Sequence, residues 1–421
     1  MVAPRGVAPR RILIFVDGFS IGGAERQVFL LAKHLRQAGH RVEVWGFESG
    51  QGEGSLQIDL ARIDVVTRTI QRSLCWSWVK MGRRHGYIYN LSALRELVRE
   101  WRRQLKDVPT ARFDWAIPFT PDPGLYLLLY RGRIQTKVLV WNHRGGADPG
   151  GFPYNRALAL IGQWRLDGWV ANSSVGVSYL AGLFGVSGDC ARFMPNIYEV
   201  GNYLARSDQR RRSTGAIIVQ VANIYPEKDP ETLIRAFSLI RDHSRQPTLV
   251  LVGRWTSGEQ FENARRLVKA LGISDQVTFA GELNSGQVND MLGRAAIGVL
   301  SSRSEGCPNS VLEYMGHALP IVATRISGIE QMLPADSKAC LFDVGDHVEC
   351  AERLKALLDD PERSDALGLE NRRMVESAYS GPTVVEQWSE YLESLASRSF
   401  LTRILARTAL LRSFGRSDVR R

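Results

Sequence analysis

Short apolar runs alternate with amphipathic segments along most of the chain, in two separate series. The first series opens with the apolar run Arg11–Asp17, a helical pattern over Ala24–Gln37 and a second apolar run, Arg41–Phe47. It resumes with apolar runs at Trp115–Pro118 and Lys137–Trp141. Continuous apolar runs of this length are typical of strands buried in a parallel sheet, whereas apolar residues at every third or fourth position predict helices.

The second series begins near residue 216. Its apolar runs are Ala216–Val221, Thr248–Val252, Gln276–Ala280, Ala296–Ser301 and Pro320–Ala323, and helical patterns occupy 230–241, 259–271, 286–293 and 309–318. Regular alternation of strands and helices predicts parallel sheets with helices on both faces. The chain is therefore predicted to be an α/β protein with two parallel-sheet domains, linked by the polar, Arg-rich stretch 195–215.

The length of 421 residues agrees with two domains. We place an N-terminal domain at 1–198, a second domain at 199–381, and a terminal helix with a basic tail at 382–421. Two such domains around a linker would form a cleft, and parallel α/β sheets bind ligands at the carboxyl ends of their strands. Candidate binding residues are therefore sought in the loops that follow strands.

Composition excludes several classes of protein. Hydrophobic residues make up 44% and charged residues 23%, which argues against a disordered chain, a collagen and a polytopic membrane protein. No secretory signal is expected in the N-terminal MVAPRGVAPRR, and the longest apolar candidate, Leu125–Tyr130, is too short to span a bilayer. Five cysteines without a CxxC pair indicate a reducing compartment rather than a disulfide or zinc framework.

The net charge of +10 comes from two segments. Residues 62–112 hold twelve Lys and Arg against four Asp and Glu, and residues 398–421 hold seven Arg against one Asp. The first segment also mixes aromatic residues with cations: Trp76, Trp78, Tyr87 and Tyr89 with Lys80, Arg83 and Arg84. This composition favours an anionic surface as partner, either lipid headgroups or nucleic acid, and a solvated basic face is the alternative.

The basic tail is predicted to form a helix. Phe400, Ile404, Leu411 and Phe414 would lie on one arc of it, which Arg407 interrupts. Such a helix could lie on a membrane surface. The alternative is that it packs back on the N-terminal domain.

The strongest local motif is Ser304–Met315, with the sequence SEGCPNSVLEYM, which follows the fourth predicted strand of the second series. Pro308 suits the first turn of the next helix. The N–H groups of Cys307, Asn309 and Ser310 would then point into the cleft, where a helix start attracts phosphate.

Two glutamates belong to this motif. The side chain of Glu313 would tilt back toward the helix N-terminus and reach a neutral hydroxyl beside a bound phosphate. Glu305 precedes the helix and would be free to face a reacting centre. The alternative is purely structural: a carboxylate near the helix start, with a surface glutamate before it.

Two further segments suggest contact with an anion. Lys228 stands just before a predicted helix, where a lone cation opposes the helix dipole unless an anion lies between them. An exposed loop lysine is the alternative. Gly22 and Gly23 open the first helix and would let the backbone approach a ligand, although the pattern is not the GxGxxG of dinucleotide-binding proteins.

Taken together, these segments resemble the retaining glycosyltransferases of family 4. The resemblance rests on GGAER at 22–26, Asn196 in an MPN segment, Lys228, and the Glu-x7-Glu pair of Glu305 and Glu313. It extends from about residue 11 to residue 395. It implies the GT-B fold, in which two Rossmann-like domains face each other across a cleft, with 1–198 on the acceptor side and 199–381 binding the nucleotide-sugar donor.

The resemblance also implies how the donor diphosphate would be bound. Lys228 would supply the positive charge. The backbone at Gly22 and Gly23 would approach the diphosphate from the other domain, beside the helix start at Asn309 and Ser310.

Other residues would contact the rest of the donor. Glu313 would hold the ribose hydroxyls, and Glu305 would contact the donor sugar near its reacting face. His143 falls where family members often place a histidine near that sugar. Glu305 and His143 are therefore the candidate catalytic residues.

The sequence departs from the family pattern in two places. Many members have an arginine as a second phosphate ligand, where this chain has Asn223, a neutral group that is still counted among the diphosphate-binding candidates. Arg26 or Arg254 would have to compensate for the missing charge. The family's double glycine after the strand Pro320–Ala323 appears here as Ser327–Gly328.

No cofactor and no metal ion is implied. The chain contains no DxD motif, the pattern with which other glycosyltransferases hold Mn²⁺ or Mg²⁺ at the diphosphate. Lys228 and the helix N–H groups would instead stabilise the negative charge that grows on the leaving diphosphate.

The resemblance implies the classes of donor and acceptor. UDP-linked donors are favoured, UDP-N-acetylhexosamines among them, with a GDP-mannose-dependent mannosyltransferase as the alternative. The acceptor would be a glycan or a polyprenyl-linked glycan of cell-surface polysaccharide or glycolipid synthesis, recognised by residues 48–112 and the loop Gly145–Gly151. The enzyme would then be cytoplasmic, peripheral on the inner face of the cell membrane.

Two other functional classes stay open at this point. A nucleotide-sugar epimerase with a GT-B-like fold would share the nucleotide site but lack the basic, aromatic acceptor segment. A DNA-modifying sugar transferase or a nucleic-acid-binding protein would use that same segment, but no nucleic-acid motif is present, so nucleic acid is not expected as a partner.

Overall fold

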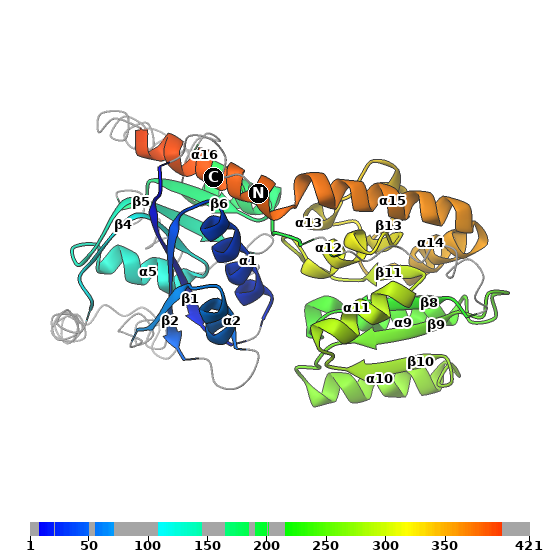
Figure 1. The fold of residues 1–421 in the computed structure, drawn as a ribbon. Helices are drawn as coiled ribbons and strands as arrows, with labels where there is room; N and C mark the ends of the chain where they lie inside the picture. Colours follow the sequence, from blue (N-terminus) through cyan, green and yellow to red (C-terminus); the bar gives the residue numbers. More distant parts are fainter. Residues whose placement is uncertain are drawn as a thin grey trace, which may run out of the picture. The chain divides into compact units, whose positions relative to one another are not determined.

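The computed structural model describes residues 8–20, 22–49, 55–70, 108–144, 165–184, 190–199, 201 and 215–397. The chain divides into two compact units, drawn in Figure 1. Unit 1 comprises Met1–Ile197 and Gly381–Arg421, and unit 2 comprises Tyr198–Ser380. The chain therefore leaves unit 1 once, completes unit 2, and returns to unit 1 with its last described helix.

The described part of unit 1 is built on a seven-stranded parallel sheet with the order β3-β2-β1-β4-β5-β6-β7. Its strands are β1 (Arg11–Gly18), β2 (Arg41–Glu48), β3 (Val66–Thr69), β4 (Ala111–Pro118), β5 (Ile134–His143), β6 (Gly168–Ala171) and β7 (Ala191–Phe193). Its helices are α1 (Gly23–Gln37), α2 (Leu56–Arg62), α5 (Pro121–Leu129), α7 (Ser174–Phe184) and α16 (Gly381–Ser397). The strand order reverses beside β1, which is where such sheets bind ligands.

Helices cover both faces of this sheet. Successive side chains of a strand point to opposite faces, so a continuous apolar run needs a covering layer on each face. Ile14 of β1 belongs to a core with α1, α2 and α16, which includes Trp388. Its neighbour Phe15 belongs to a second core with α5 and α7, and its ring lies 5.4 Å from that of Tyr126.

Helix α16 is tied to the sheet of unit 1 through Tyr391. The main-chain N–H of Trp169 donates to the Tyr391 hydroxyl at 3.0 Å, and that hydroxyl donates to the carbonyl oxygen of Cys190 at 2.7 Å. A Cβ at Gly168 would lie 2.3 Å from the same hydroxyl, so only glycine leaves room for it. The helix predicted for the basic tail, 398–421, lies outside the described residues.

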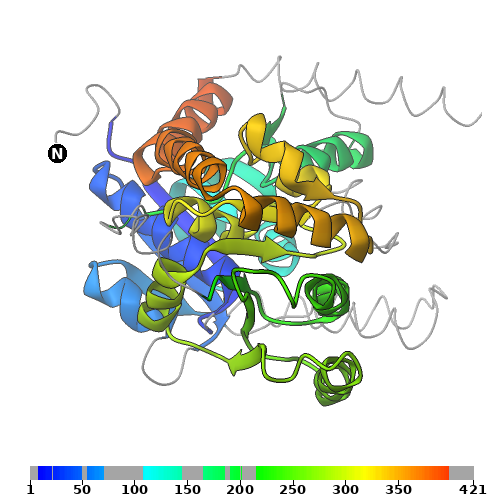
Figure 2. The same ribbon diagram turned by 90° about the vertical axis from the view of Figure 1, so that its right-hand side faces the viewer.

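Unit 2 has a six-stranded parallel sheet in its described part, with the order β10-β9-β8-β11-β12-β13. Its elements are drawn in green to orange in Figure 2. Its strands are β8 (Ile217–Val221), β9 (Thr248–Val252), β10 (Val277–Gly281), β11 (Ile297–Leu300), β12 (Ile321–Thr324) and β13 (Leu341–Phe342). Its α-helices are α9 (Pro230–Ser238), α10 (Gly258–Ala270), α11 (Ser285–Arg294), α12 (Asn309–Gly316), α13 (Ser327–Glu330), α14 (His347–Asp359) and α15 (Pro361–Ala378). The prediction of two parallel-sheet α/β domains is confirmed.

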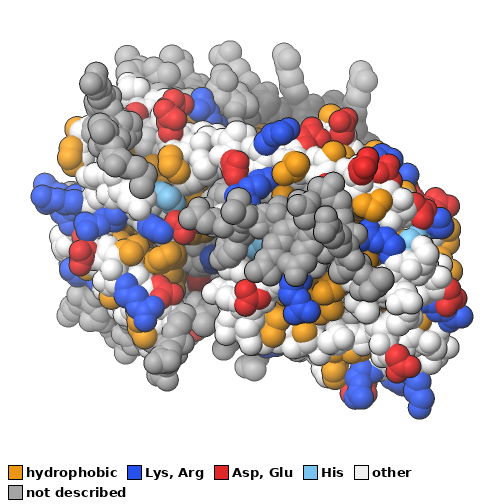
Figure 3. Space-filling model, turned by 45° about the vertical axis from the view of Figure 1, so that its right-hand side comes forward, with side chains coloured by type: hydrophobic (Ala, Val, Ile, Leu, Met, Phe, Trp, Pro, Cys, Tyr) orange, Lys and Arg blue, Asp and Glu red, His pale blue; other side chains and the backbone are white. Residues whose placement is uncertain are grey.

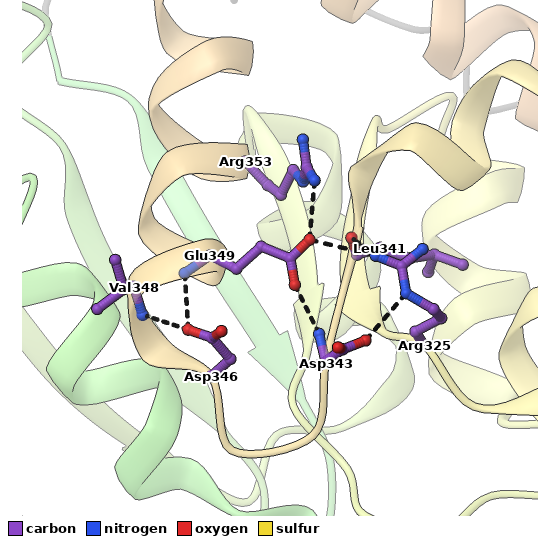
Figure 4. Close-up of polar contacts among 7 residues, drawn as sticks. All are labelled: Arg325, Leu341, Asp343, Asp346, Val348, Glu349 and Arg353. Carbon is purple, nitrogen blue, oxygen red and sulfur yellow. Dashed lines mark hydrogen bonds and ion pairs between the residues drawn. The ribbon is translucent and has the colours of Figure 1, made fainter.

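The edge strand β13 is held by charged side chains (Figure 4). The carboxylate of Glu349 on α14 accepts hydrogen bonds from the Asp343 N–H at 2.9 Å, from Arg353 at 2.8 Å and from Arg325 at 3.2 Å. Arg325, which follows β12, also donates to the Asp343 carboxylate and to the Leu341 carbonyl oxygen, each at 3.0 Å. A strand of two residues is thus secured by contacts with its neighbours in space.

This network predicts a pH-dependent loss of stability in the variant Glu349→Gln. The hydrogen bond from Arg353, with the Asp343 N–H and the charges of Arg353 and Arg325, lowers the pKa of Glu349 below its ordinary value of 4.5. We expect the variant to lose about 1 kcal/mol in free energy of unfolding at neutral pH, a modest value because Glu349 is partly exposed. A lowered folded-state pKa contributes stability above the unfolded pKa and loses it as the pH falls.

The difference between wild type and variant should therefore shrink as the pH falls below 4.5. Urea unfolding of both proteins at neutral and at acidic pH measures it. An equal difference at the two pH values would contradict the prediction.

Candidate functional site

The two loops that carry the strongest motifs of unit 2 follow neighbouring strands at the centre of its sheet. β8 and β11 are hydrogen-bonded to each other, and the loops 222–229 and 301–308 follow them. From β8, the next strand in the chain lies on one side and β11 on the other, so the strand order reverses between β8 and β11. Because parallel strands end at the same edge, both loops lie at the position where open α/β sheets bind ligands.

The main chain at Lys228 is fastened to the end of β11. Lys228 ends a short turn of 3-10 helix, Pro226–Lys228. Ser301 Oγ lies 3.1 Å from the carbonyl oxygen of Lys228 and 2.8 Å from that of Asp229, and Gln220 Nε2 donates to Ser301 Oγ at 3.4 Å. Gln220 and Ser301 are fully buried, so the position of Lys228 is set by the core of the sheet.

The side chains of Lys228 and Glu305 form an ion pair, and each is only 10% exposed. Lys228 Nζ donates to Oε1 of Glu305, and the Ser302 hydroxyl donates to the same oxygen at 2.7 Å. Ser302 is held in turn by Thr324, whose hydroxyl donates to the Ser302 carbonyl oxygen at 2.6 Å. The Glu305 carboxylate is therefore oriented by residues at the ends of β11 and β12.

The surroundings of Lys228 keep it charged. Burial alone would lower the pKa of Lys228, but the Glu305 carboxylate and the Tyr225 side chain outweigh that effect and raise the pKa above its ordinary value. The Tyr225 ring centroid lies 5.1 Å from Nζ. At neutral pH the site thus contains an ammonium and a carboxylate in contact.

The sequence argument that Lys228 is a lone cation at a helix start is wrong. Asp229 is the N-cap of α9, where its carboxylate accepts from the Thr232 N–H at 3.4 Å. Arg303 lies 3.0 Å from the same carboxylate. The helix start therefore has its own anion, and Lys228 is paired with Glu305, which comes 77 residues later.

Helix α12 places three predicted site residues directly after the Glu305 loop. Pro308 is its N-cap, with φ −67° and ψ 126°, and not part of its first turn as predicted from the sequence. Asn309 and Ser310 are the first two helical residues, and the N–H groups of such residues have no acceptor within the helix. Glu313 lies further along the same helix and is 8% exposed.

The loop after β12 has Ser327–Gly328 where a double glycine is expected, and the structure shows why the second position is glycine. A Cβ at this position would lie 2.1 Å from the carbonyl oxygen of Glu305 and 2.6 Å from that of Gly306. Gln331 also donates to the Gly306 carbonyl oxygen at 3.3 Å. The second position of the family's double glycine is therefore kept where the Glu305 loop requires close approach, while Ser327 occupies the first.

The cations that could compensate for the neutral Asn223 are placed separately in the two units. Asn223 is exposed in the loop after β8, and its Oδ1 accepts from the main-chain N–H of Arg254 at 3.3 Å. Arg254 is exposed in unit 2, and Arg26 is exposed on α1 of unit 1. Arg303, which the sequence argument did not single out, is 59% exposed beside Asp229.

Gly22 and Gly23 lie at the start of α1, after β1 of unit 1. Gly22 is the N-cap, with φ −160°, a conformation open to any residue. A Cβ at Gly22 would lie 2.4 Å from the Glu25 carboxylate, which therefore folds back over the helix start. Burial and the nearby charge of Asp17 raise the pKa of Glu25, against a backbone hydrogen bond that lowers it.

His143 ends β5, at the same edge of the unit 1 sheet as Gly22. It is partly exposed, and its ring centroid lies 5.3 Å from that of Tyr179 on α7. A Cβ at Gly176 would approach the His143 ring to 3.0 Å. His143, Gly22 and Gly23 thus belong to unit 1, whereas Lys228 and Glu305 belong to unit 2.

Five residues that orient the Lys228–Glu305 pair were not predicted from the sequence. These are Gln220, Ser301, Ser302, Thr324 and Tyr225. One signal was present: Ser301 and Ser302 are polar residues directly after a buried strand, at the edge where such sheets bind ligands. The ion pair between Lys228 and Glu305 could not be predicted from the sequence near either residue, because the two are 77 residues apart.

Several sequence predictions fall outside the described residues. They concern the aromatic and basic residues of 71–107, the loop Gly145–Gly151 and the tail 398–421. Over the face drawn in Figure 3, basic and acidic side chains of the described residues are interspersed. In the part of the chain that the structure describes, no helix has the length and apolar character needed to cross a bilayer, and no group of three or more His, Cys, Asp or Glu residues is arranged to hold a metal ion.

Two family models match the chain and together span most of it. Residues 21–200 match the model described as "Glycosyltransferase Family 4". Residues 204–374 match the model described as "Glycosyl transferases group 1". The division between the two matches falls close to the boundary between unit 1 and unit 2.

Comparison with individual proteins agrees with these matches. The chain is 25% identical over 378 residues to an uncharacterized glycosyltransferase of Haemophilus influenzae, covering 89% of this chain and 97% of that protein. It is 24% identical over 198 residues to a GDP-mannose-dependent alpha-(1-6)-phosphatidylinositol monomannoside mannosyltransferase of Mycobacterium tuberculosis, covering 45% of this chain and 51% of that protein. Among solved structures, Anabaena HepE in complex with UDP and glucose superposes with a TM-score of 0.71 at 18% identity, covering 91% of this chain and 100% of the other.

Proposed function

Since the chain is a glycosyltransferase with the GT-B fold, we propose that it transfers a sugar from a nucleotide-sugar donor to a glycan or lipid-linked acceptor, with retention of the anomeric configuration. The observation that carries this proposal is the contact between Lys228 and Glu305 at the strand-order reversal of unit 2. A cation and a carboxylate lie side by side there, and we assign the cation to the diphosphate and the carboxylate to the sugar.

The chemistry that we propose follows from these groups. The bond between the anomeric carbon and the diphosphate oxygen breaks, and negative charge grows on the diphosphate. Lys228 and the N–H groups at the start of α12 stabilise that charge, while Glu313 on the same helix holds the ribose. The acceptor hydroxyl attacks on the face from which the diphosphate leaves and gives its proton to the diphosphate.

We favour UDP as the nucleotide of the donor. HepE, which shares the fold over 91% of this chain, was crystallised with UDP and glucose. The mannosyltransferase of Mycobacterium tuberculosis, which matches over 45% of this chain, is named as GDP-mannose-dependent. A GDP-mannose donor is therefore the second candidate.

Release of nucleotide from a panel of donors tests the proposed activity. The purified chain is incubated with UDP-glucose, UDP-N-acetylglucosamine, UDP-N-acetylgalactosamine and GDP-mannose, with and without a polyprenyl-linked glycan. We expect UDP release from at least one UDP-sugar, with acceptor-dependent product. Release of GDP alone would replace the UDP assignment with the GDP-mannose alternative, and inversion of the anomeric centre in the product would overturn the retaining mechanism.

Transfer is expected to survive removal of metal ions. The chain has no DxD motif, and Lys228 with the α12 helix start can balance the diphosphate charge instead. The rate measured in excess EDTA should equal the rate measured with added Mg²⁺ or Mn²⁺. A loss of activity in EDTA that either ion restores would show that a metal ion holds the diphosphate.

We further propose that the acceptor is lipid-linked and that the enzyme works at the inner face of the cell membrane. The sequence supports this through the surplus of positive charge in 62–112 and 398–421, with aromatic residues beside the cations of the first segment. Each Lys or Arg near an anionic leaflet contributes on the order of 1 kcal/mol of binding free energy.

Flotation with liposomes measures this association. We expect the chain to float with anionic vesicles at low ionic strength, to be released at high ionic strength, and not to float with neutral vesicles. A chain that ends at Ser397, where α16 ends, separates the contribution of the tail from that of residues 62–112. Equal recovery with neutral and anionic vesicles, or no flotation, would contradict an electrostatic attachment.

A further inference from the structure

The Lys228–Glu305 pair neutralises the positive charge that a diphosphate would need. Both side chains are 10% exposed, and Oε1 of Glu305 accepts from Lys228 Nζ and from the Ser302 hydroxyl. The position of Asn223, where a second cation is expected in proteins of this pattern, offers a neutral amide. The two charges of this contact therefore cancel.

A donor cannot use Lys228 fully while this pair is closed. A diphosphate brings negative charge next to a carboxylate, and like charges in a partly buried site repel strongly. The same carboxylate also shields the ammonium. Either Glu305 moves away from Lys228 when the donor binds, or the diphosphate is bound by other groups and the pair is only structural.

The surrounding contacts favour movement of Glu305 rather than of Lys228. The main chain at Lys228 is fixed by Ser301 and Gln220, which are fully buried. Glu305 lies in a loop, and among the described residues its carboxylate has one neutral hydrogen bond besides the ion pair, from Ser302. A carboxylate that leaves Lys228 can keep the Ser302 hydroxyl as a partner, because the serine is held separately by Thr324.

We propose that Glu305 is the internal counter-ion of Lys228 in the unliganded enzyme, and that the donor diphosphate binds by replacing it. This inference rests on the proposed function, since it assigns Lys228 to a diphosphate. The exchange keeps Lys228 paired at every stage and releases the Glu305 carboxylate for contact with the donor sugar only after the diphosphate has arrived. Glu305 thus lowers the affinity for nucleotide while serving the transfer step.

The test is the affinity of the full chain for UDP and for GDP, measured by calorimetry. Glu305→Gln keeps the size of the side chain and removes its charge, so we expect UDP to bind more tightly than to wild type, on the order of tenfold. Lys228→Ala should weaken binding, and adding Glu305→Gln to it should tighten binding less than the same change does with Lys228 present. Glu227→Gln, which removes an exposed charge next to Lys228 in sequence, should leave the affinity near the wild-type value.

The outcomes distinguish a failure of the counter-ion exchange from a failure of the proposed diphosphate site. If Lys228→Ala weakens UDP binding but Glu305→Gln does not tighten it, the counter-ion role is wrong and the diphosphate site stands. If Lys228→Ala has no effect on UDP or GDP, the diphosphate site itself is wrong. Equal tightening by Glu305→Gln and Glu227→Gln would show a general charge effect and would also overturn the exchange.

Thermal unfolding gives a second measurement that does not depend on turnover. Glu305→Gln leaves the Lys228 ammonium without its counter-ion, so the unliganded variant should melt below wild type. Saturating UDP should then raise its Tm by more than it raises that of wild type. If Glu305→Gln folds poorly, Glu305→Asp can replace it, because it keeps the charge on a shorter side chain. UDP should raise the Tm of Glu305→Asp by more than that of wild type, but by less than that of Glu305→Gln. An unchanged UDP-induced shift in both variants would contradict the proposal.

Discussion

Replacement of Lys228 by alanine is expected to lower the rate of sugar transfer at least ~10²-fold, about 2.7 kcal/mol of transition-state stabilisation. The ammonium is held charged by its surroundings and lies at the carboxyl end of β8, where the leaving diphosphate would be bound. Because the diphosphate is negative in both the bound donor and the transition state, binding of the donor should weaken as well. Steady-state kinetics on the donor identified by nucleotide release measures both effects.

Two controls belong with this variant. Lys269→Ala removes an exposed lysine from α10 of the same unit and should leave the rate unchanged. Lys228→Ala leaves Glu305 without its partner, so its melting temperature should fall, and adding Glu305→Gln should restore stability without restoring transfer. Wild-type kinetics in Lys228→Ala would remove this residue from the mechanism.

Glu305→Gln is expected to lower the rate of transfer by a similar factor, at least ~10²-fold. Here the loss should appear in kcat, because the carboxylate is proposed to act on the donor sugar as the bond to the diphosphate breaks. Affinity for UDP should change in the opposite direction, as argued above. Single-turnover measurements at saturating donor isolate the transfer step, and Glu227→Gln is the matched control for loss of one negative charge in this unit.

The rate of transfer and the affinity for UDP of Glu305→Gln test two separate roles of Glu305. Full transfer activity in Glu305→Gln would contradict a catalytic role for Glu305 even if UDP bound more tightly. A slow variant with unchanged UDP affinity would keep the catalytic role and reject the exchange of counter-ions.

Periodicity along the chain predicted the strands that are continuous apolar runs, but it missed β3, β6, β7 and β13. Thr248–Val252 was predicted as a strand and forms β9 with the same bounds. Arg41–Phe47 forms β2 with one further residue. In contrast, β13 has only two residues, Leu341 and Phe342, and it depends on contacts with β12 and α14. No local pattern distinguishes so short a strand from a loop.

The candidate site was predictable to the level of its loops. The motif Ser304–Met315 and Lys228 each follow an apolar run, and strand order brought those runs next to each other at β8 and β11. The roles assigned to Lys228, Glu305, Glu313 and the other site residues remain predictions. The local argument failed where it treated a residue as isolated: the helix beside Lys228 is capped by Asp229, and Lys228 itself is paired.

The sequence by itself determined the class of fold, the alternation of strands and helices, and the loops in which chemistry is to be sought. These properties depend on residues within a few positions of one another, where backbone preference and apolar spacing act directly. Only the tertiary structure decided that Glu305 contacts Lys228, that Ser301 and Ser302 orient the pair, and that Gly328 must lack a side chain beside the Glu305 loop. Apart from the contact of Ser302 with Glu305, which lies within one loop, these contacts join segments 23 to 77 residues apart. Which segments meet is set by the order of the strands in the sheet and by the packing of helices against it.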